Sequence, residues 1–524
     1  MGIGKHASKV SSAIFGSRIL GLVRDQIFAA LMGAGFMADA YIIAFRIPNL
    51  LRDLFAEGSL TNAFVPTLTE YRVQQSDEKA WEFVGLTFGW ILLLVGGLTL
   101  AGMVFAPEVV RWIAPGFQDI EGKFELTVTL ARIMFPFFVF VSVASVLMGI
   151  HNTDNQFALP ALAPMVFNIV SIACGVLVWK LGLEGNASVI GWSVGTLCGG
   201  LGQCLIQLPP LLRKGYRIGP RFRGMFSHPG IKSMAVLMLP SLVAVSGTQV
   251  NVLVNSILAS FLEQGAPSWL NYAFRLMQLP LGVFGVAISM VTLATVSQDV
   301  AHKQDGHVGK TLESSILITL FLTLPSAFGL WALGYPIIEL IYERGAFGAQ
   351  DTCRHGHGLA DVCPGTSDVC PGKGFGSDFF SFKDPKKPMI ASLSGIGFNI
   401  AFNLWAYKHL GHSGLALGTS LGMGLNFLLL LYFVSKRNLQ MPTFTITLGL
   451  SKMILSSAVM AWVARSTYEM MAHPEVGSLL GKISRTLIPV GVGLAVYLGM
   501  SLILKVPQAT QVMNVLMRRF RRSD

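Results

Sequence analysis

The sequence predicts an all-α integral membrane protein, and three observations support that prediction. The chain of 524 residues is 52% hydrophobic and only 13% charged, whereas soluble domains are about 25% charged. Its mean hydropathy is +0.59. Apolar runs close to the ~20 residues that cross a bilayer recur along the whole chain. Because lipid offers the backbone no hydrogen-bonding partners, we expect these runs to be helices.

Thirteen membrane spans are visible by this pattern. The first run contains Arg18 and Arg24, and no small-residue cleavage site follows a clean apolar core, so we do not interpret it as a cleaved signal. The spans cover residues 10–33, 37–66, 81–106, 126–150, 158–181, 187–211, 233–262, 268–298, 312–342, 389–409, 413–435, 448–471 and 485–505.

Lysine and arginine gather in alternate loops, which accounts for the net charge of +11. The densest groups lie in the loop 213–232 and in the C-terminal tail 518–522. Cytoplasmic loops of membrane proteins carry such an excess of basic residues. The pattern therefore places both termini in the cytoplasm, and it argues against nucleic acid as the partner of the positive charge.

The same loop pattern predicts a span that the visible sequence lacks. The basic groups at 303–310 and 383–387 both belong on the cytoplasmic side, so an even number of spans must separate them. Only one, 312–342, is visible. Residues 351–378 read DTCRHGHGLADVCPGTSDVCPGKGFGSD, which cannot cross a bilayer as a helix.

Three interpretations of this patch can be weighed. It contains Cys353, Cys363, Cys370, His355 and His357, which are residue types that bind zinc, but their spacing matches no close pair of ligand pairs. A disulfide is a second interpretation. We favour a third, in which residues 353–377 are translated in a shifted reading frame. A one-base shift of the back-translated segment reads AATATALQTYALGLPTFVLVKVLAP, an apolar span that would be the fourteenth.

Arginines inside the first two apolar runs point to an anionic substrate. An arginine at the centre of a membrane helix costs roughly 2.5–3.5 kcal/mol, so four unpaired ones facing lipid would cost on the order of 10 kcal/mol. We therefore expect them to face the protein interior or a water-filled cavity. The planar guanidinium fork is well suited to phosphate. The four residues are Arg18, Arg24, Arg46 and Arg52.

These arginines form a repeated motif, R-x5-R-D. Arg18, Arg24 and Asp25 make up the first copy, and the second copy, 28 residues later, consists of Arg46, Arg52 and Asp53. A step of seven residues is nearly two helical turns, so Arg18 and Asp25 share a face. In the second copy Pro48 is expected to kink or break the helix. We select Arg18, Arg24 and Arg52 as ligands. Arg46 and Asp53 lie near span ends, where a role in ligand binding and a structural role, by snorkelling or by ion pairing, suit them equally.

Two further residues complete the candidate site. Arg275, in Ala273-Phe274-Arg275, echoes Ala44-Phe45-Arg46, and a proline follows shortly in both copies. This weak internal repeat fits a transporter with two related lobes and a site between them. Asp39 opens the second span. It could cap that helix or act as the gating partner of an arginine.

The sequence does not suggest an enzyme. No phosphate-binding G-x-x-x-x-G-K-[ST] loop is present, which argues against ATP hydrolysis. We expect no cofactor and no metal, and we leave the coupling ion open. Energy would come from an ion gradient or from the membrane potential, which supplies about 2.3 kcal/mol per charge per 100 mV.

Several segments of the chain resemble the MurJ/MviN family of bacterial lipid II flippases, within the multidrug/oligosaccharidyl-lipid/polysaccharide transporter superfamily. They include SRILGLVRDQIFAALMGAG, ADAYIIAFRIPNLLRDLFAEGSLTNAFVPTLTEY, APGF, ALPALAPMVFNI and YAFRLMQLPLGVFGVAI. The resemblance runs along nearly the whole chain and implies a 14-helix, two-lobed transporter fold. The family also carries the phrase K-V-L-A-P where the shifted frame produces it.

The resemblance also implies a division of the chain. Two six-helix lobes would enclose a central cationic cavity, and two more helices would line a groove for the lipid tail. The expected parts are an N-terminal lobe at 1–212, a basic cytoplasmic loop at 213–232, a C-terminal lobe at 233–437 and the two additional helices with a basic tail at 438–524.

By the same resemblance, the residues that bind the pyrophosphate and the rest of the head group are Arg18, Arg24, Arg52 and Arg275. Asp25 and Asp39 would have orienting or gating roles. The family often has an aspartate before the second-lobe arginine and a glutamate three positions after it. This chain has Phe274 and Gln278 there, which leaves Arg275 with less local counter-charge.

The function implied is that of a secondary transporter. It would flip lipid II, the lipid-linked peptidoglycan precursor, across the bacterial inner membrane by alternating access, for cell-wall synthesis. Its partners would be lipid II, membrane lipid and the cell-wall synthesis machinery. Two alternatives stay open. One is an exporter of another lipid-linked glycan or of a drug, although a drug exporter would favour an acidic cavity. The other is a membrane glycosyltransferase that uses a polyprenyl phosphate.

Overall fold

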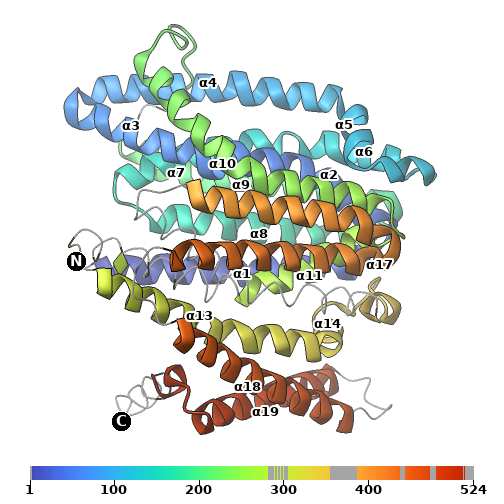
Figure 1. Cartoon of the computed structure of the whole chain (residues 1–524). Helices are drawn as coiled ribbons and strands as arrows, with labels where there is room; N and C mark the ends of the chain where they lie inside the picture. The colour runs from blue at the N-terminus through green and yellow to red at the C-terminus, as the bar shows by residue number, and fades with distance from the viewer. Residues whose placement is uncertain are drawn as a thin grey trace. The chain divides into compact units, whose positions relative to one another are not determined.

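In the part of the chain that the computed structural model describes, all regular secondary structure is helical (Figure 1). That part comprises residues 3–216, 218–280, 305–353, 386–436, 443–471, 479–511 and 513, with single positions at 288, 292, 295, 296, 299 and 302. The chain divides into two compact units. The N-terminal unit contains Met1–Ser268 and Arg344–Phe347, and the C-terminal unit contains Trp269–Glu343 and Gly348–Asp524.

The helices of the N-terminal unit follow one another with short connections. They are α1 (Ile3–Met32), α2 (Phe36–Arg52), the π-helix η1 (Asp53–Leu60), α3 (Thr61–Gln74), α4 (Asp77–Val104), α5 (Ala106–Ile113), the 3₁₀-helix η2 (Pro115–Asp119), α6 (Lys123–Met134), α7 (Phe137–Thr153), α8 (Ala158–Lys180), α9 (Gly185–Arg213) and α10 (Pro229–Ser260).

The helix α11 (Ala266–Pro280) begins in the N-terminal unit and continues into the C-terminal one. The C-terminal unit then contains α13 (Asp305–Ala332), α14 (Gly334–Tyr342), α17 (Lys386–Ser435), α18 (Thr443–Met470) and α19 (Leu479–Ile503). Of the shifted segment predicted at 353–377, all but Cys353 lies outside the described residues. The boundaries predicted from the sequence for the two lobes stay a prediction.

The structure confirms an all-α membrane fold. Within the described residues, eight helices are long and apolar enough to cross a membrane, or nine if the bent pair in α10 is one span. Nine of our thirteen spans are covered by these eight helices, since α17 alone covers two, and α10 covers a tenth. The helix α1 is not among them, although it has 30 residues. Its arginines account for this, because they lower its hydropathy and raise its charge count.

Several helix boundaries differ from the spans we predicted. The span 126–150 is two helices, α6 and α7, with a break at Phe135–Pro136. The span 312–342 is likewise divided, at Leu333, into α13 and α14. In α17 the backbone leaves helical geometry at Gly411, with φ 60° and ψ −139°, between the two spans we placed there. A glycine tolerates this left-handed φ where other residues are strained.

Pro48 does not break its helix as we expected. The α-helix continues through Pro48 to Arg52 and becomes a π-helix at Asp53. The irregularity therefore begins at Asp53, the last residue of the second motif copy, and π-helical turns often occur at functional sites.

Small residues let neighbouring helices approach closely, as is usual within membranes. Gly175 on α8 faces the ring of Trp192 on α9, and an added Cβ would lie 2.2 Å from that ring. Gly195 and Gly199 on α9 similarly meet Cys174 and Phe167 on α8. This close packing, together with an aromatic cluster around Phe64 and Phe83, gives the N-terminal unit a rigid interior on which α1 and α2 can hold charged residues.

Candidate functional site

The two copies of the R-x5-R-D motif form the same ion pair. On α1, Arg24 donates from Nε (3.1 Å) and from Nη2 (2.8 Å) to Oδ1 of Asp25. At the end of α2, Arg52 donates from Nε (3.2 Å) and from Nη2 (2.8 Å) to Oδ1 of Asp53. Each aspartate therefore holds one edge of the neighbouring guanidinium, so the sequence repeat is also a repeat in geometry.

Both pairs are partly buried, which suits a site inside a membrane. The side chains of Arg24 and Asp25 are 13% and 11% exposed, and those of Arg52 and Asp53 are 25% and 26% exposed. The four charged side chains are therefore mostly shielded from solvent but still accessible to a ligand. The guanidinium of Arg24 also lies over the ring of Phe167 on α8, 5.2 Å from its centre, a geometry that stabilises a cation.

The second pair has a partner that the sequence did not indicate. Gln249 on α10 donates from Nε2 to the other oxygen of Asp53, Oδ2, at 3.3 Å. Asp53 thus accepts on both carboxylate oxygens. Arg46, which precedes Arg52 by six residues, is also partly buried. Its Nε atom is fully covered and has no hydrogen-bond acceptor among the described residues.

Asp39 is the most buried of the predicted site residues, with 0% exposure. Its charged partner is Lys123 at the start of α6, 2.9 Å away. Asp39 lies in the first turn of α2, whose N-cap is Gly35, so it does not cap its own helix. Instead it accepts hydrogen bonds at the start of α11, from the backbone N–H of Gly265 (2.8 Å) and from Ser268, through N–H (3.1 Å) and Oγ (2.6 Å).

The structure gives Asp39 a partner on another helix, while its orienting or gating role stays a prediction. Among the residues described, the charge that neutralises Asp39 is a lysine and not an arginine. Lys123 is 1% exposed, and its ammonium lies 4.2 Å from the centre of the Phe117 ring. Asp39 and Lys123 therefore join the starts of α2, α6 and α11 in one buried cluster. We name these residues, with Gly265 and Ser268, the Asp39 cluster.

Arg18 and Arg275 lie in different units. Arg18 is partly buried on α1, and Arg275 is partly buried on α11 next to Phe274. Gln278, one turn further along α11, is exposed. The meeting of these two arginines with Arg24 and Arg52 around one ligand stays a prediction.

Comparison with known proteins agrees with this cationic, helical architecture. The family model described as "Lipid II flippase MurJ" matches residues 28–482, which is most of the chain. The chain belongs to the MurJ family. Among its relatives is the probable lipid II flippase MurJ of Vibrio cholerae, which is 33% identical over 508 residues, or 95% of each chain. The lipid II flippase MurJ of Burkholderia cenocepacia is 33% identical over 429 residues, with 82% of this chain and 83% of that one covered.

Solved structures place the MurJ family member described here in a wider fold group. A structure of lipid II flippase MurJ in an inward closed conformation matches with a TM-score of 0.79 at 28% identity, covering 94% of this chain and 98% of that one. An inward-facing MATE family multidrug resistance transporter matches with a TM-score of 0.67 at 16% identity, covering 80% and 94%. The second likeness concerns the fold alone.

As a MurJ family member, the chain is a transporter and not an enzyme. A short match to the hydrolase pattern G-x-S-x-G, Gly418–Gly422, lies within α17, where Ser420 donates to the carbonyl of Ala416. That pattern needs a sharp strand-to-helix turn, which a continuous helix does not provide. In the part of the chain that the structure describes, no three histidine, cysteine or acidic residues gather as a metal site.

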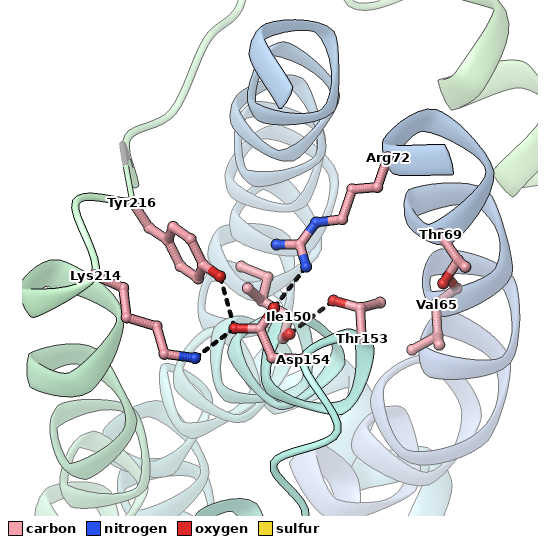
Figure 2. A network of polar contacts seen from close by, with 8 residues as sticks. All are labelled: Val65, Thr69, Arg72, Ile150, Thr153, Asp154, Lys214 and Tyr216. Atoms are coloured by element: carbon pink, nitrogen blue, oxygen red, sulfur yellow. Dashed lines mark hydrogen bonds and ion pairs between the residues drawn. The ribbon is translucent and has the colours of Figure 1, made fainter. Parts of the chain in front are cut away.

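A second polar cluster lies where α3, α7 and α9 end, and Figure 2 shows it. Asp154 accepts from Arg72 at 2.6 Å, from Lys214 at 2.8 Å and from the Tyr216 hydroxyl at 2.7 Å. Burial alone would raise the pKa of Asp154, but the hydrogen bonds from Lys214, Tyr216 and Arg72 outweigh it and hold that pKa below its ordinary value. Sequence analysis gave no sign of this cluster, whose three donors are 60 to 82 residues from Asp154.

Proposed function

We propose that this chain carries the head group of lipid II from the cytoplasmic to the outer leaflet of the bacterial inner membrane by alternating access. Membership of the lipid II flippase MurJ family supports the substrate, and the charge of the site supports the chemistry. In this proposal Arg18, Arg24, Arg52 and Arg275 bind the pyrophosphate, and the polyprenyl tail stays in lipid beside α18 and α19. Both termini lie in the cytoplasm.

The repeated Arg-Asp pair is the observation that supports this proposal best. An isolated arginine would be costly in the membrane, and its long side chain could adopt many orientations. An adjacent aspartate lowers the net charge and holds the guanidinium in one orientation. A bound pyrophosphate can then compete for, or share, the donor groups of a cation that is already in place.

The charge of these side chains also separates lipid II from the substrates of transporters with a similar fold. The likeness to a MATE family transporter shows that the fold alone does not define the substrate. Arginine-lined helices favour anions, whereas export of cationic drugs would favour carboxylates without paired cations. A pyrophosphate linked to a lipid satisfies both the charge and the membrane location.

The experiment is complementation of cells depleted of their own lipid II flippase. Arg24→Ala and Arg52→Ala should each abolish growth while the protein is expressed and inserted normally. Arg132→Ala is the matched control, because Arg132 is exposed and bonds only the carbonyl of Met103 among the residues described. In the same cells, labelled lipid II should stay inaccessible from outside. Full growth and normal accessibility with both site variants would refute the assignment.

A further inference from the structure

Arg46 carries a buried donor for which the described part of the chain provides no acceptor. Its Nε atom is covered by protein and makes no hydrogen bond there. The guanidinium cannot lose its proton at any ordinary pH. Buried polar groups nearly always have a partner, and an unpaired buried charge is strongly unfavourable. The exception at Arg46 therefore requires an explanation.

Asp53 does not supply the missing acceptor. It lies seven residues after Arg46, about two helical turns away, and its charge acts on Arg46. However, no hydrogen bond joins the two side chains among the described residues, where Oδ1 of Asp53 accepts from Arg52 and Oδ2 accepts from Gln249. Asp53 thus attracts Arg46 across a distance without bonding to it.

Snorkelling explains only part of the Arg46 side chain. A snorkelling side chain extends its charged end into the interfacial water, whereas the Nε of Arg46 is covered. Ile43 and Ala44 before it and Ile47 after it are buried as well. Arg46 as a whole is only partly buried, so the terminal nitrogens of its guanidinium stay accessible. What Arg46 lacks among the described residues is a bonded counter-ion.

We propose that Arg46 is a further anion-binding residue of the head-group site, which donates from its guanidinium to a phosphate or carboxylate oxygen of the transported lipid. This inference rests on the proposed function. It adds to the Arg-Asp pairs an arginine without a bonded counter-ion, which a ligand oxygen can engage without displacing an aspartate. An uncompensated cation should gain more from an incoming anion than a paired one does.

The test measures binding of two probes to the full-length protein in lipid nanodiscs. The probes are lipid II, which carries pyrophosphate and peptide carboxylates, and undecaprenyl pyrophosphate, which carries no peptide. Arg46→Gln should raise the Kd about tenfold, and Arg46→Lys should raise it less because it keeps the charge. A loss with both probes identifies the pyrophosphate as the partner. A loss with lipid II alone identifies a carboxylate.

Thermal unfolding of the ligand-free protein separates ligand binding from a structural role. Because Arg46 has no bonded partner among the described residues, Arg46→Gln should melt at the same temperature as the parent chain or higher. A lower melting temperature with an unchanged Kd for both probes would overturn the inference. Arg24→Gln and Arg52→Gln run in parallel as a check on the proposed function. If they also bind normally, the proposed function fails, and if they lose binding while Arg46→Gln does not, only the Arg46 inference fails.

Discussion

Replacing Lys123 with methionine tests whether the Asp39 cluster holds three helices together. The change removes the ammonium and keeps most of the aliphatic volume, so Asp39 stays buried at 0% exposure without its cation. Breaking a buried ion pair on one side costs about 3–5 kcal/mol. Asp39 keeps three of its four hydrogen bonds, those from Gly265 and Ser268, so we expect the lower end, about 3 kcal/mol.

The assay is thermal unfolding of the purified chain in detergent. At roughly 2–3 °C per kcal/mol for a large domain, Lys123→Met should lower the melting temperature by about 6–9 °C. The matched control is Lys180→Met, because Lys180 is exposed at the end of α8. The double variant Asp39→Asn with Lys123→Met should recover part of the loss, since removing both charges leaves no buried ion unpaired.

Two results would refute this reasoning. One is a melting temperature for Lys123→Met within about 1 °C of the parent, which would mean that Asp39 does not depend on its cation. The other is a double variant that is less stable than Lys123→Met. That result would mean that the negative charge of Asp39 stabilises the start of α11 more than it depends on pairing with Lys123.

Three further predictions concern other parts of the N-terminal unit. Asp154→Asn should cost about 2 kcal/mol, since hydrogen bonds to a charged group contribute about 1.5–3 kcal/mol and Lys214 is largely exposed. Because the pKa of Asp154 is lowered in the fold, the difference in melting temperature between parent and variant should persist from pH 8 to 5. It should vanish only as the pH falls below the ordinary value of 3.8 and through the lowered pKa. Gly89→Ala should lower the melting temperature of the protein, because the added Cβ would lie 2.1 Å from the carbonyl oxygen of Arg221. Gly97→Ala is the control and should leave the melting temperature unchanged, because the space around Gly97 is open. Gln249→Leu should weaken lipid II binding, since it frees an oxygen of Asp53 for Arg46, and the neighbouring exposed Thr248→Val should leave the Kd unchanged.

The helices of this protein could be predicted well because a single quantity defines them, the length of an apolar run. The break at Gly411 was visible as a short gap between two such runs. The breaks at Phe135 and Leu333 were not visible, because both residues are apolar and continue the run. The passage from α-helix to π-helix at Asp53 likewise has no signature in hydropathy.

The candidate site was predictable only where its partners are close in sequence. The pairs formed by Arg24 with Asp25 and by Arg52 with Asp53 are between adjacent residues, and the repeated motif indicated them. Lys123 is 84 residues from Asp39 and Gln249 is 196 residues from Asp53. Neither has a local pattern that reports its partner. The only sign of the Asp39 partner in the sequence was Lys123, a single lysine just before the apolar run at 126–150. A lysine in a solvated loop has the same appearance in a sequence.

Comparing Arg24, Arg46 and Arg52 shows how one motif can give different functions to similar residues. Arg24 and Arg52 each have an aspartate as the next residue, and each is held by it through two hydrogen bonds. Arg46 is followed by Ile47, and the carboxylate whose charge acts on it is Asp53, which bonds to Arg52 and Gln249. The pairs keep two guanidinium groups oriented at low cost in the membrane, while the unpaired cation keeps a net attraction for anions. Transporters of similar fold that carry cations would need the opposite balance, with an unpaired carboxylate in place of an unpaired arginine. Selectivity in this fold would then depend on which single charge lacks a bonded partner, and less on the number of charges along α1 and α2.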